Sequence, residues 1–163
     1  VSREPTGDIG VRVRGCAQAH THQHVTAAPA LSQLGAEIAI ARAKQSAGVA
    51  IGDVRYAAVY DSFTITLAML LEDLGLAGRG EAAARVRDGY FGRDGDMPLN
   101  THGGLLSYGH CGVGGAMAHL VETHLQMTAR AGNRQVRDAS VALLHGDGGV
   151  LSSHVSMFLE RVR

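Results

Sequence analysis

The stretch of sequence that decides the fold reads Leu99-Asn100-Thr101-His102-Gly103-Gly104-Leu105-Leu106-Ser107-Tyr108-Gly109-His110-Cys111-Gly112-Val113-Gly114-Gly115. Its two histidines stand eight residues apart among six glycines, and the stretch holds no charged side chain. Glycines at this density allow sharp turns and let a backbone approach a ligand closely. A glycine-rich turn that leads into a helix also leaves free N–H groups for an anion or a developing negative charge. We therefore expect His110, on this turn, to act as a general base or acid.

Strands and helices alternate on either side of this stretch. Apolar residues recur at period two in the strand-like segments and at helical spacing in the others. The expected segments are, in chain order, a strand over 9–17, a helix over about 32–47, a strand over 55–60, a helix that Asp61 or Ser62 caps and that ends at Gly75, a short helix over 81–87, a helix over roughly 113–130, and strands over 139–144 and 149–159. This order predicts an α/β fold of packed layers, with a mixed sheet that closes in a β-hairpin.

Turn and core residues follow from the same pattern. The Asp147-Gly148 pair is typical of a hairpin turn between the last two strands. Gly48 is a suitable stop for the helix over 32–47. The side chains expected on the buried helix faces are Leu34, Ile38, Ala41 and Ala43 on the first helix, and Leu67, Leu70, Leu71 and Leu74 on the second.

The composition limits the class of protein. A chain of 163 residues is long enough for one domain with its own core. Its 15 basic and 15 acidic residues balance, so the charge indicates neither nucleic acid nor a membrane surface as a partner. No apolar run reaches the ~18–20 residues that span a bilayer, and no signal peptide is evident at the N-terminus. Cys16 and Cys111 lack disulfide-framework or zinc-ligand spacing, so we expect a reduced, cytoplasmic setting with Cys16 as buried filler.

A second histidine cluster reads His20-Thr21-His22-Gln23-His24. In an extended segment the three imidazoles would share one face, which suits a metal ion. No carboxylate or cysteine neighbours them, so a polar loop is the favoured interpretation and we expect no metal site.

Three sequence blocks carry a resemblance to a known family. They are Tyr60-Asp61-Ser62-Phe63-Thr64, the Asn100-Thr101-His102-Gly103-Gly104…Gly109-His110 block, and His145-Gly146-Asp147-Gly148-Gly149. Together they resemble the C-terminal half of a thiolase, most closely the sterol-carrier-protein and lipid-transfer-protein type thiolases and the thiolase-like aldolases. The resemblance covers about residues 9–160. It implies one half of an αβαβα sandwich, usually dimeric, in which 1–30 end the first half and form a substrate-side loop, and 31–163 form the C-terminal domain.

The resemblance also implies roles for residues of the central stretch. His110 matches the family histidine that activates a nucleophilic cysteine, and it would help to stabilise the thioester oxygen. His102 would line the acyl pocket or bond that oxygen. The cofactor contacts expected of the backbone lie at Gly109, Gly112, Gly114, Gly148 and Gly149. Coenzyme A is then a substrate or cosubstrate, and no permanently bound cofactor is expected.

Three departures from the family pattern bear on the reaction. Tyr60 stands where classical thiolases have the asparagine of Asn-Glu-Ala-Phe, and in the aldolase-like branch a tyrosine here is associated with carbon–carbon cleavage. His145 stands where thiolases place an acid/base cysteine, although a one-residue shift would put Gly146 there. Asp147 is expected to serve the turn alone. Cys111 replaces the usual proline after Gly-His and is interpreted as a tolerated substitution.

Three functions remain open at this point. The first is the C-terminal catalytic half of a thiolase-like acyl-CoA acyltransferase, with His110, Tyr60, His102 and His145 as catalytic residues. The second is a retro-aldol lyase of side-chain acyl-CoA, and the third is a non-catalytic acyl-CoA-binding or assembly module. A complete thiolase is longer and carries its nucleophilic cysteine in the first half. We therefore expect a missing N-terminal half, in the same or a separate chain, an apolar surface that packs on it, and a homo-oligomer.

Overall fold

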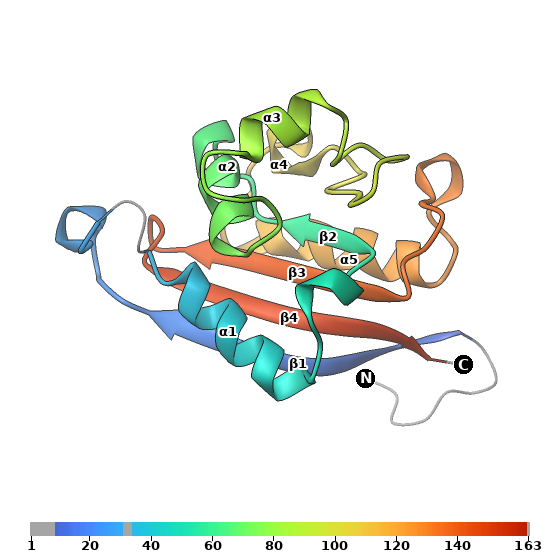
Figure 1. Cartoon of the computed structure of the whole chain (residues 1–163), viewed down its shortest axis with the longest axis horizontal. Helices are drawn as coiled ribbons and strands as arrows, with labels where there is room; N and C mark the ends of the chain where they lie inside the picture. The colour runs from blue at the N-terminus through green and yellow to red at the C-terminus, as the bar shows by residue number, and fades with distance from the viewer. Residues whose placement is uncertain (1–8, 31–33, 163) are drawn as a thin grey trace.

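The computed structural model describes residues 9–30 and 34–162, which form a mixed four-stranded sheet between two layers of helices (Figure 1). The strands are β1 (Gly10–His20), β2 (Tyr56–Val59), β3 (Val141–Gly148) and β4 (Ser153–Val162). Their order is β1-β4-β3-β2. β4 runs antiparallel to both of its neighbours, and β2 runs parallel to β3. The C-terminal ends of β2 and β3 therefore meet at one edge of the sheet, where ligands of α/β proteins commonly bind.

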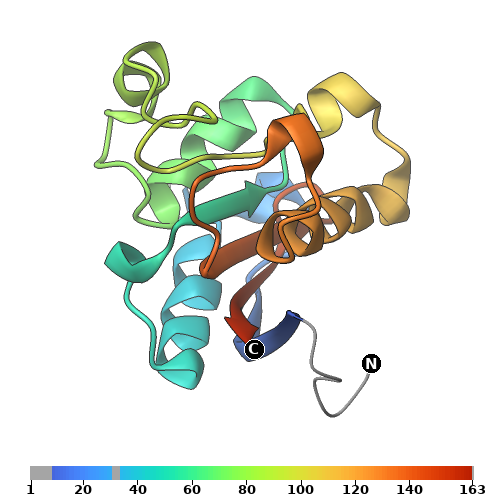
Figure 2. The same cartoon turned by 90° about the vertical axis from the view of Figure 1, so that its right-hand side faces the viewer.

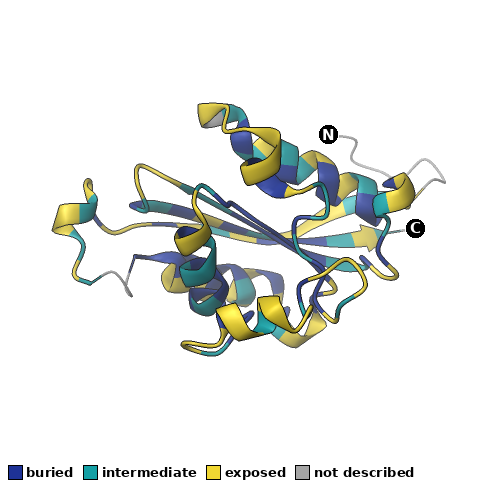
Figure 3. Cartoon of the chain, turned by 90° about the horizontal axis from the view of Figure 1, so that it is seen from above, coloured by how far each residue is buried: buried dark blue, intermediate teal, exposed yellow. Residues whose placement is uncertain are grey.

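The helices cover both faces of this sheet. They are α1 (Ala36–Ala47), α2 (Thr64–Asp73), α3 (Ala82–Arg87), α4 (Gly104–Tyr108) and α5 (Gly115–Met127). Helix α1 packs on β1 and β4, whereas α5 packs on β2 and β3 from the opposite side (Figure 2). Seen from above, the strands lie between helices whose outward faces are exposed (Figure 3).

Strand alternation produces two separate hydrophobic cores. On β2, Ala57 and Val59 belong to the core shared with α1 and α2, whereas Tyr56 and Ala58 belong to the core under α5. Leu143 and Ala142 of β3 divide between the two cores in the same way. Successive strand side chains point to opposite faces, so near-continuous apolar runs are what a sheet covered on both sides requires.

The α/β architecture predicted from the sequence is confirmed, but several local expectations are wrong. Helix α1 begins at Ala36, and its buried residues are Ala36, Ala39, Ile40, Ala43 and Ala47, whereas Ile38 and Ala41 are exposed. Residues 31–33, where we expected its start, lie outside the described residues. Gly48 does end this helix, in the left-handed conformation (φ 62°). Cys16 is exposed rather than buried.

The last hairpin turns later than predicted. Asp147 and Gly148 belong to β3, where they pair with His154 and Ser153. The turn runs over 149–152 and carries left-handed residues at Gly149, Val150 and Leu151 (φ 59°, 58° and 64°). A β-branched valine rarely adopts a positive φ, so sequence rules do not predict left-handed residues at Val150 and Leu151.

Asp61 and Ser62 do not cap helix α2, contrary to our expectation. Phe63 occupies the N-cap position without a side-chain bond. The Asp61 carboxylate instead accepts hydrogen bonds from the backbone N–H groups of Leu105 (2.8 Å) and Leu106 (3.3 Å). Those two residues belong to α4, a five-residue helix that the sequence did not predict. The carboxylate thus joins the end of β2 to the glycine-rich stretch.

Apolar side chains are exposed on the side of α4 and α5 that no other described element covers. They are Leu106, Tyr108, Met117 and Val121. In the described residues no helix is both long and apolar enough to cross a membrane. The division of the chain at residue 30 and the oligomeric state stay predictions, but β1 pairs with β4 from Gly10 to His20, with one irregularity between Val13 and Gly15.

Candidate active site

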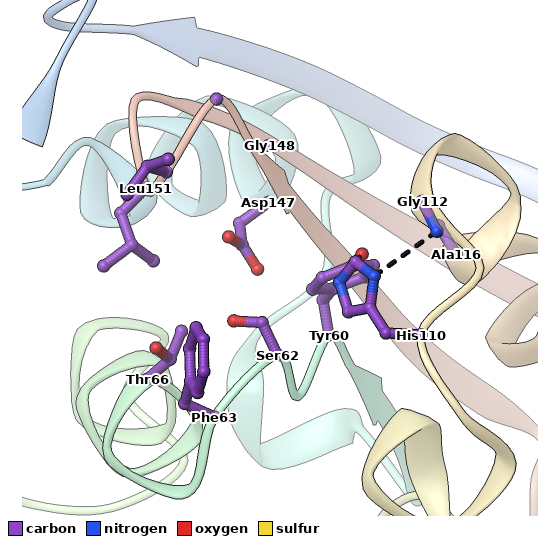
Figure 4. Close-up of a pocket in the computed structure, with 12 residues that line it drawn as sticks. Tyr60, Ser62, Phe63, Thr66, His110, Gly112, Ala116, Asp147, Gly148 and Leu151 are labelled. Atoms are coloured by element: carbon purple, nitrogen blue, oxygen red, sulfur yellow. Dashed lines mark hydrogen bonds between the residues drawn. The ribbon is translucent and has the colours of Figure 1, made fainter.

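A cavity of about 620 Å³ opens beside the C-terminal ends of β2 and β3. Tyr60 follows β2 directly, and Asp147 lies near the end of β3. The remaining walls come from the start of α2, the glycine-rich stretch and the β3–β4 turn (Figure 4). These lining residues are Ser62, Phe63, Thr66, His110, Gly112, Ala116, Gly148, Gly149, Val150 and Leu151.

Tyr60 and His110 are joined by a short hydrogen bond at this cavity. The Tyr60 hydroxyl oxygen lies 2.6 Å from His110 Nε2, and the two rings meet edge to face at 86°. The Gly112 backbone N–H donates to the other ring nitrogen, Nδ1, over 3.3 Å (Figure 4). A neutral imidazole has one N–H and one acceptor nitrogen, so this bond assigns the proton to Nε2. His110 therefore donates to Tyr60, and the tyrosine's own O–H hydrogen is left to point elsewhere.

Tyr60 is a neutral phenol at physiological pH. Burial raises its pKa above the usual value, and the nearby carboxylate of Asp147 raises it further. A neutral phenol can donate a hydrogen bond to an oxygen that gains negative charge. A Tyr60 hydroxyl that accepts from His110 can donate its own hydrogen to a ligand in the cavity.

Buried groups hold this pair in place. His119 of α5 lies behind Tyr60, and its Nε2 is 3.3 Å from Asp61 Oδ1, with both side chains almost fully buried. Burial alone would raise the pKa of Asp61, but the nearby His119 imidazole and the backbone hydrogen bonds from the start of α4 outweigh it and lower the pKa. A Cβ at Gly104 would overlap the Asp61 carboxylate, which explains the glycine there.

Asn100 fixes the other end of the glycine-rich stretch to β2. Its side-chain amide accepts from the Val59 N–H (2.9 Å) and donates to the Val59 carbonyl (2.8 Å). Both bonds are buried, and Asn100 has the left-handed φ of 45° that asparagine tolerates. The loop that presents His110 is therefore anchored at its start by Asn100 and in its middle by Asp61.

His102 lies outside this cavity. It lines a separate hollow of about 240 Å³ with Tyr108, Met117 and Val121. Its ring meets that of His119 edge to face, with centroids 5.0 Å apart. Neither ring nitrogen has a hydrogen-bond partner among the described residues, and burial lowers the pKa of His102. The buried His119 ring therefore lies next to both His102 and Tyr60, and His102 itself does not reach the Tyr60–His110 pair.

His145 does not line the cavity either. It is fully buried within the sheet, where Nδ1 lies 2.8 Å from Ser156 Oγ and Nε2 lies 3.2 Å from His154 Nδ1. Burial lowers its pKa to about 3. His145 and Asp147 point to the same face of β3. Ser156 and His154 of β4 contact His145, whereas Asp147, nearer the strand end, lines the cavity. Gly146 is not among the lining residues, so neither alternative for the family's second cysteine reaches the Tyr60 hydroxyl.

Asp147 is the site residue that sequence reasoning missed. It lines the cavity, and its Oδ1 is buried without a hydrogen-bond partner in the described part of the chain. Burial raises its pKa to about 6, although the imidazole of His110 pulls in the opposite direction. Extending the predicted strand over 139–144 by four residues would have placed this side chain on a strand end instead of in a turn.

The glycines expected to contact a cofactor divide into two groups. Gly112, Gly148 and Gly149 line the cavity, whereas Gly109 and Gly114 do not. The backbone at Gly112 also makes the bond that orients His110. Close backbone approach is therefore available at three of the five predicted positions.

The histidines of the 20–24 segment do not gather around one point. His20 is exposed on β1, His22 Nδ1 lies 2.8 Å from Thr21 Oγ1, and His24 bonds Thr26. Over 9–30 and 34–162, no group of three His, Cys, Asp or Glu side chains is placed to hold a metal ion.

The sheet covered by helices on both faces, and the loop from Asn100 to His110 over the ends of β2 and β3, match the architecture of a thiolase C-terminal half. The model of the family described as thiolase C-terminal domain-like matches residues 17–161. The chain belongs to this family, as its sequence blocks suggested.

Individual relatives include both transferases and lyases. An acetyl-CoA acetyltransferase of Methanothermobacter thermautotrophicus is 33% identical over 159 residues, which cover 95% of this chain and 41% of that protein. A 17-hydroxy-3-oxo-4-pregnene-20-carboxyl-CoA lyase of Mycobacterium tuberculosis is 44% identical over 59 residues, 36% of this chain and 15% of that protein. The solved Ltp2-ChsH2(DUF35) aldolase has a TM-score of 0.76 and 25% identity, covering 90% of this chain and 39% of that one. The chain thus spans about two fifths of the acetyltransferase and of the aldolase chain.

Proposed function

We propose that this chain supplies the C-terminal half of the active site of an enzyme that cleaves a β-hydroxyacyl-CoA by a retro-aldol reaction. The observation that carries the proposal is the Tyr60–His110 hydrogen bond at the cavity. A phenol replaces the asparagine of classical thiolases at this point. No cysteine is among the residues that line the cavity, and Cys111, which follows His110, is exposed outside this lining.

The reaction needs a base, an oxyanion site and a proton for carbon. The β-hydroxyl loses its proton, the bond between the α and β carbons breaks, and the β carbon leaves as the carbonyl of a ketone or aldehyde. The electron pair moves onto the thioester as an enolate, whose α carbon then gains a proton. No oxidant and no free coenzyme A is consumed, and the thioester is retained.

Tyr60 fits the oxyanion site of this scheme. Its oxygen accepts from His110, so its own hydrogen is free to bond the thioester oxygen as that atom becomes an enolate. A preorganised donor of this kind contributes about 10²–10³ in rate. The apolar rim of Phe63, Val150 and Leu151 suits the acyl portion, and the exposed backbone of Gly148 and Gly149 permits close approach of the thioester.

Acyl transfer is the second candidate, because the similarity to the acetyl-CoA acetyltransferase extends over nearly the whole chain. It would require a nucleophilic cysteine from outside this chain, activated at His110. The two reactions differ in their need for free coenzyme A. Thiolysis consumes it, whereas retro-aldol cleavage does not.

The test uses the purified protein together with any polypeptide that completes the thiolase fold. A β-hydroxyacyl-CoA with a tertiary hydroxyl is incubated without free coenzyme A, and the released ketone and shortened thioester are measured by mass spectrometry. We expect cleavage, and we expect Tyr60→Phe to lower kcat about 100-fold or more. Tyr90→Phe, a tyrosine away from the cavity, is the matched control and should retain activity.

Thiolysis of a β-ketoacyl-CoA that depends on free coenzyme A, without retro-aldol cleavage, would instead favour acyl transfer. Binding of acyl-CoA with neither reaction would favour the non-catalytic module.

A further inference from the structure

We propose, on the basis of the retro-aldol function above, that Asp147 is the catalytic base that takes the proton from the substrate's β-hydroxyl group. Tyr60 and His110 then serve the oxygen of the thioester and not the hydroxyl. Asp147 thus acts on the β-carbon side of the bond that breaks, and the Tyr60–His110 pair acts on the thioester side.

The position of Asp147 carries the first step. Its backbone is held in β3 by pairing with His154 of β4, so the carboxylate projects from a rigid strand end. Figure 4 shows the carboxylate pointing into the space that Ser62, Thr66 and Leu151 surround, with His110 on the far side. A substrate between Tyr60 and the apolar rim would pass directly by this group.

The hydrogen bonding of Asp147 carries the second step. Buried carboxylates are normally paired or hydrogen-bonded, because an unpaired buried charge is costly. In the described part of the chain Oδ1 is buried and has no hydrogen-bond partner, and no Arg or Lys forms an ion pair with Asp147. A structural role would supply a protein donor to this oxygen. A substrate hydroxyl would supply the missing donor.

The other titratable groups of the cavity cannot easily act as the base. Tyr60 is a neutral phenol whose pKa is raised by burial and by Asp147 itself. Both ring nitrogens of His110 already have partners, Nε2 in the Tyr60 hydroxyl and Nδ1 in the Gly112 N–H. Among the lining side chains this leaves Asp147 as the one with a free basic atom.

Proton affinity agrees with this assignment. The groups that face Asp147 are the uncharged Ser62 before α2 and Thr66 in α2, Tyr60 after β2, His110 from the glycine-rich stretch, and His154 paired from β4. In this setting burial raises the pKa of Asp147 to about 6, so the carboxylate is mainly ionised at neutral pH yet more basic than an exposed one. A base with a pKa near the working pH is the most effective.

The proton balance closes within the site. Asp147 gains the hydroxyl proton as the carbon–carbon bond breaks and the enolate forms. The same proton is then delivered to the α carbon of the enolate, which becomes the shortened acyl-CoA. Asp147 returns to its ionised form, and no further reagent enters.

The experiment compares Asp147→Asn with wild type in the complete enzyme, using the β-hydroxyacyl-CoA assay. We expect kcat to fall about 100-fold or more with KM changed only a few-fold, since asparagine keeps the shape but not the basicity. For wild type, kcat/KM should rise with pH through about 6. The residual kcat/KM of Asp147→Asn should not show this rise with pH. Asp94→Asn, an exposed carboxylate paired with Arg93, is the control and should behave as wild type.

A second variant separates loss of the base from loss of the fold. Asp147→Gly leaves space for a small acid, so added formate should restore activity in proportion to its concentration. Near-normal kcat in Asp147→Asn with an unchanged pH profile, or no formate rescue in a correctly assembled Asp147→Gly, would overturn the proposal. In either case, if the wild-type enzyme cleaves the substrate and Tyr60→Phe does not, the retro-aldol function is still supported. Absence of cleavage by wild type would overturn both.

Discussion

Two histidine pairs of this molecule share hydrogen-bond chemistry but lie in opposite surroundings. His110 bonds Tyr60 at an open cavity on a glycine-rich loop, whereas His145 bonds His154 and Ser156 inside the sheet. The sequence suggested catalysis for both His110 and His145. The difference lies in access, because His110 is exposed and His145 is 1% exposed. A histidine in a block that resembles an active site thus indicates catalysis only when the fold leaves its side chain accessible to a substrate.

The two pairs also differ in what holds them. His110 is oriented by a backbone N–H from its own loop and by a partner at the end of β2. His145 is held by two side chains of one neighbouring strand. Removing the His110 side chain should therefore lower the reaction rate, and removing the His145 side chain should lower the free energy of unfolding. The predictions below test this contrast in order of expected size.

The largest effect is expected for His110→Ala. The variant removes the donor to Tyr60, so the phenol is no longer oriented toward the thioester, and we expect kcat to fall about 10²–10³-fold. Its free energy of unfolding should change by less than about 1 kcal/mol because the side chain is exposed. Steady-state kinetics and thermal unfolding of the complete enzyme measure both. His20→Ala, an exposed histidine on β1, should change neither; unchanged turnover in His110→Ala would refute a role for the pair.

The sequence predicted the elements better than it predicted the depth of side chains within them. Local periodicity suffices for the α/β order, and the Asn100-to-His110 block indicated where the site would lie. It could not show that Asp61 is bonded to Leu105, 44 residues away, and so it assigned that carboxylate to a helix cap. It could not show the left-handed Val150 and Leu151 either, and so it placed the turn at Asp147. The misplaced turn is why Asp147 was assigned to the turn alone, whereas His145 was selected because it stands where the family has its second cysteine.

A smaller effect, on stability and not on rate, is expected for His145→Ala. The change leaves Ser156 Oγ and His154 Nδ1 without their partner and opens a space in a packed sheet, at a cost of about 2–4 kcal/mol. Because His145 does not line the cavity, kcat per folded enzyme should stay within a few-fold of wild type. Denaturant unfolding and active-site-normalised kinetics are the measurements. A loss of turnover as large as that of His110→Ala, in folded protein, would show that the two pairs are functionally linked.

The smallest effect is the pH dependence that His145 gives to stability. Burial lowers its pKa from 6.5 to about 3, so between these values the unfolded chain binds more protons than the folded one. The contribution of His145 is therefore complete above about pH 6.5 and declines as the pH falls, by roughly 1.4 kcal/mol at pH 5.5. Asp147, with its raised pKa, acts in the opposite direction over part of this range, so the wild-type curve alone mixes the two. The informative quantity is the difference in unfolding free energy between wild type and His145→Gln, which should shrink on acidification. A difference that stays constant from pH 7.5 to 5.5 would mean that folding does not shift the pKa of the His145 imidazole, contrary to its burial.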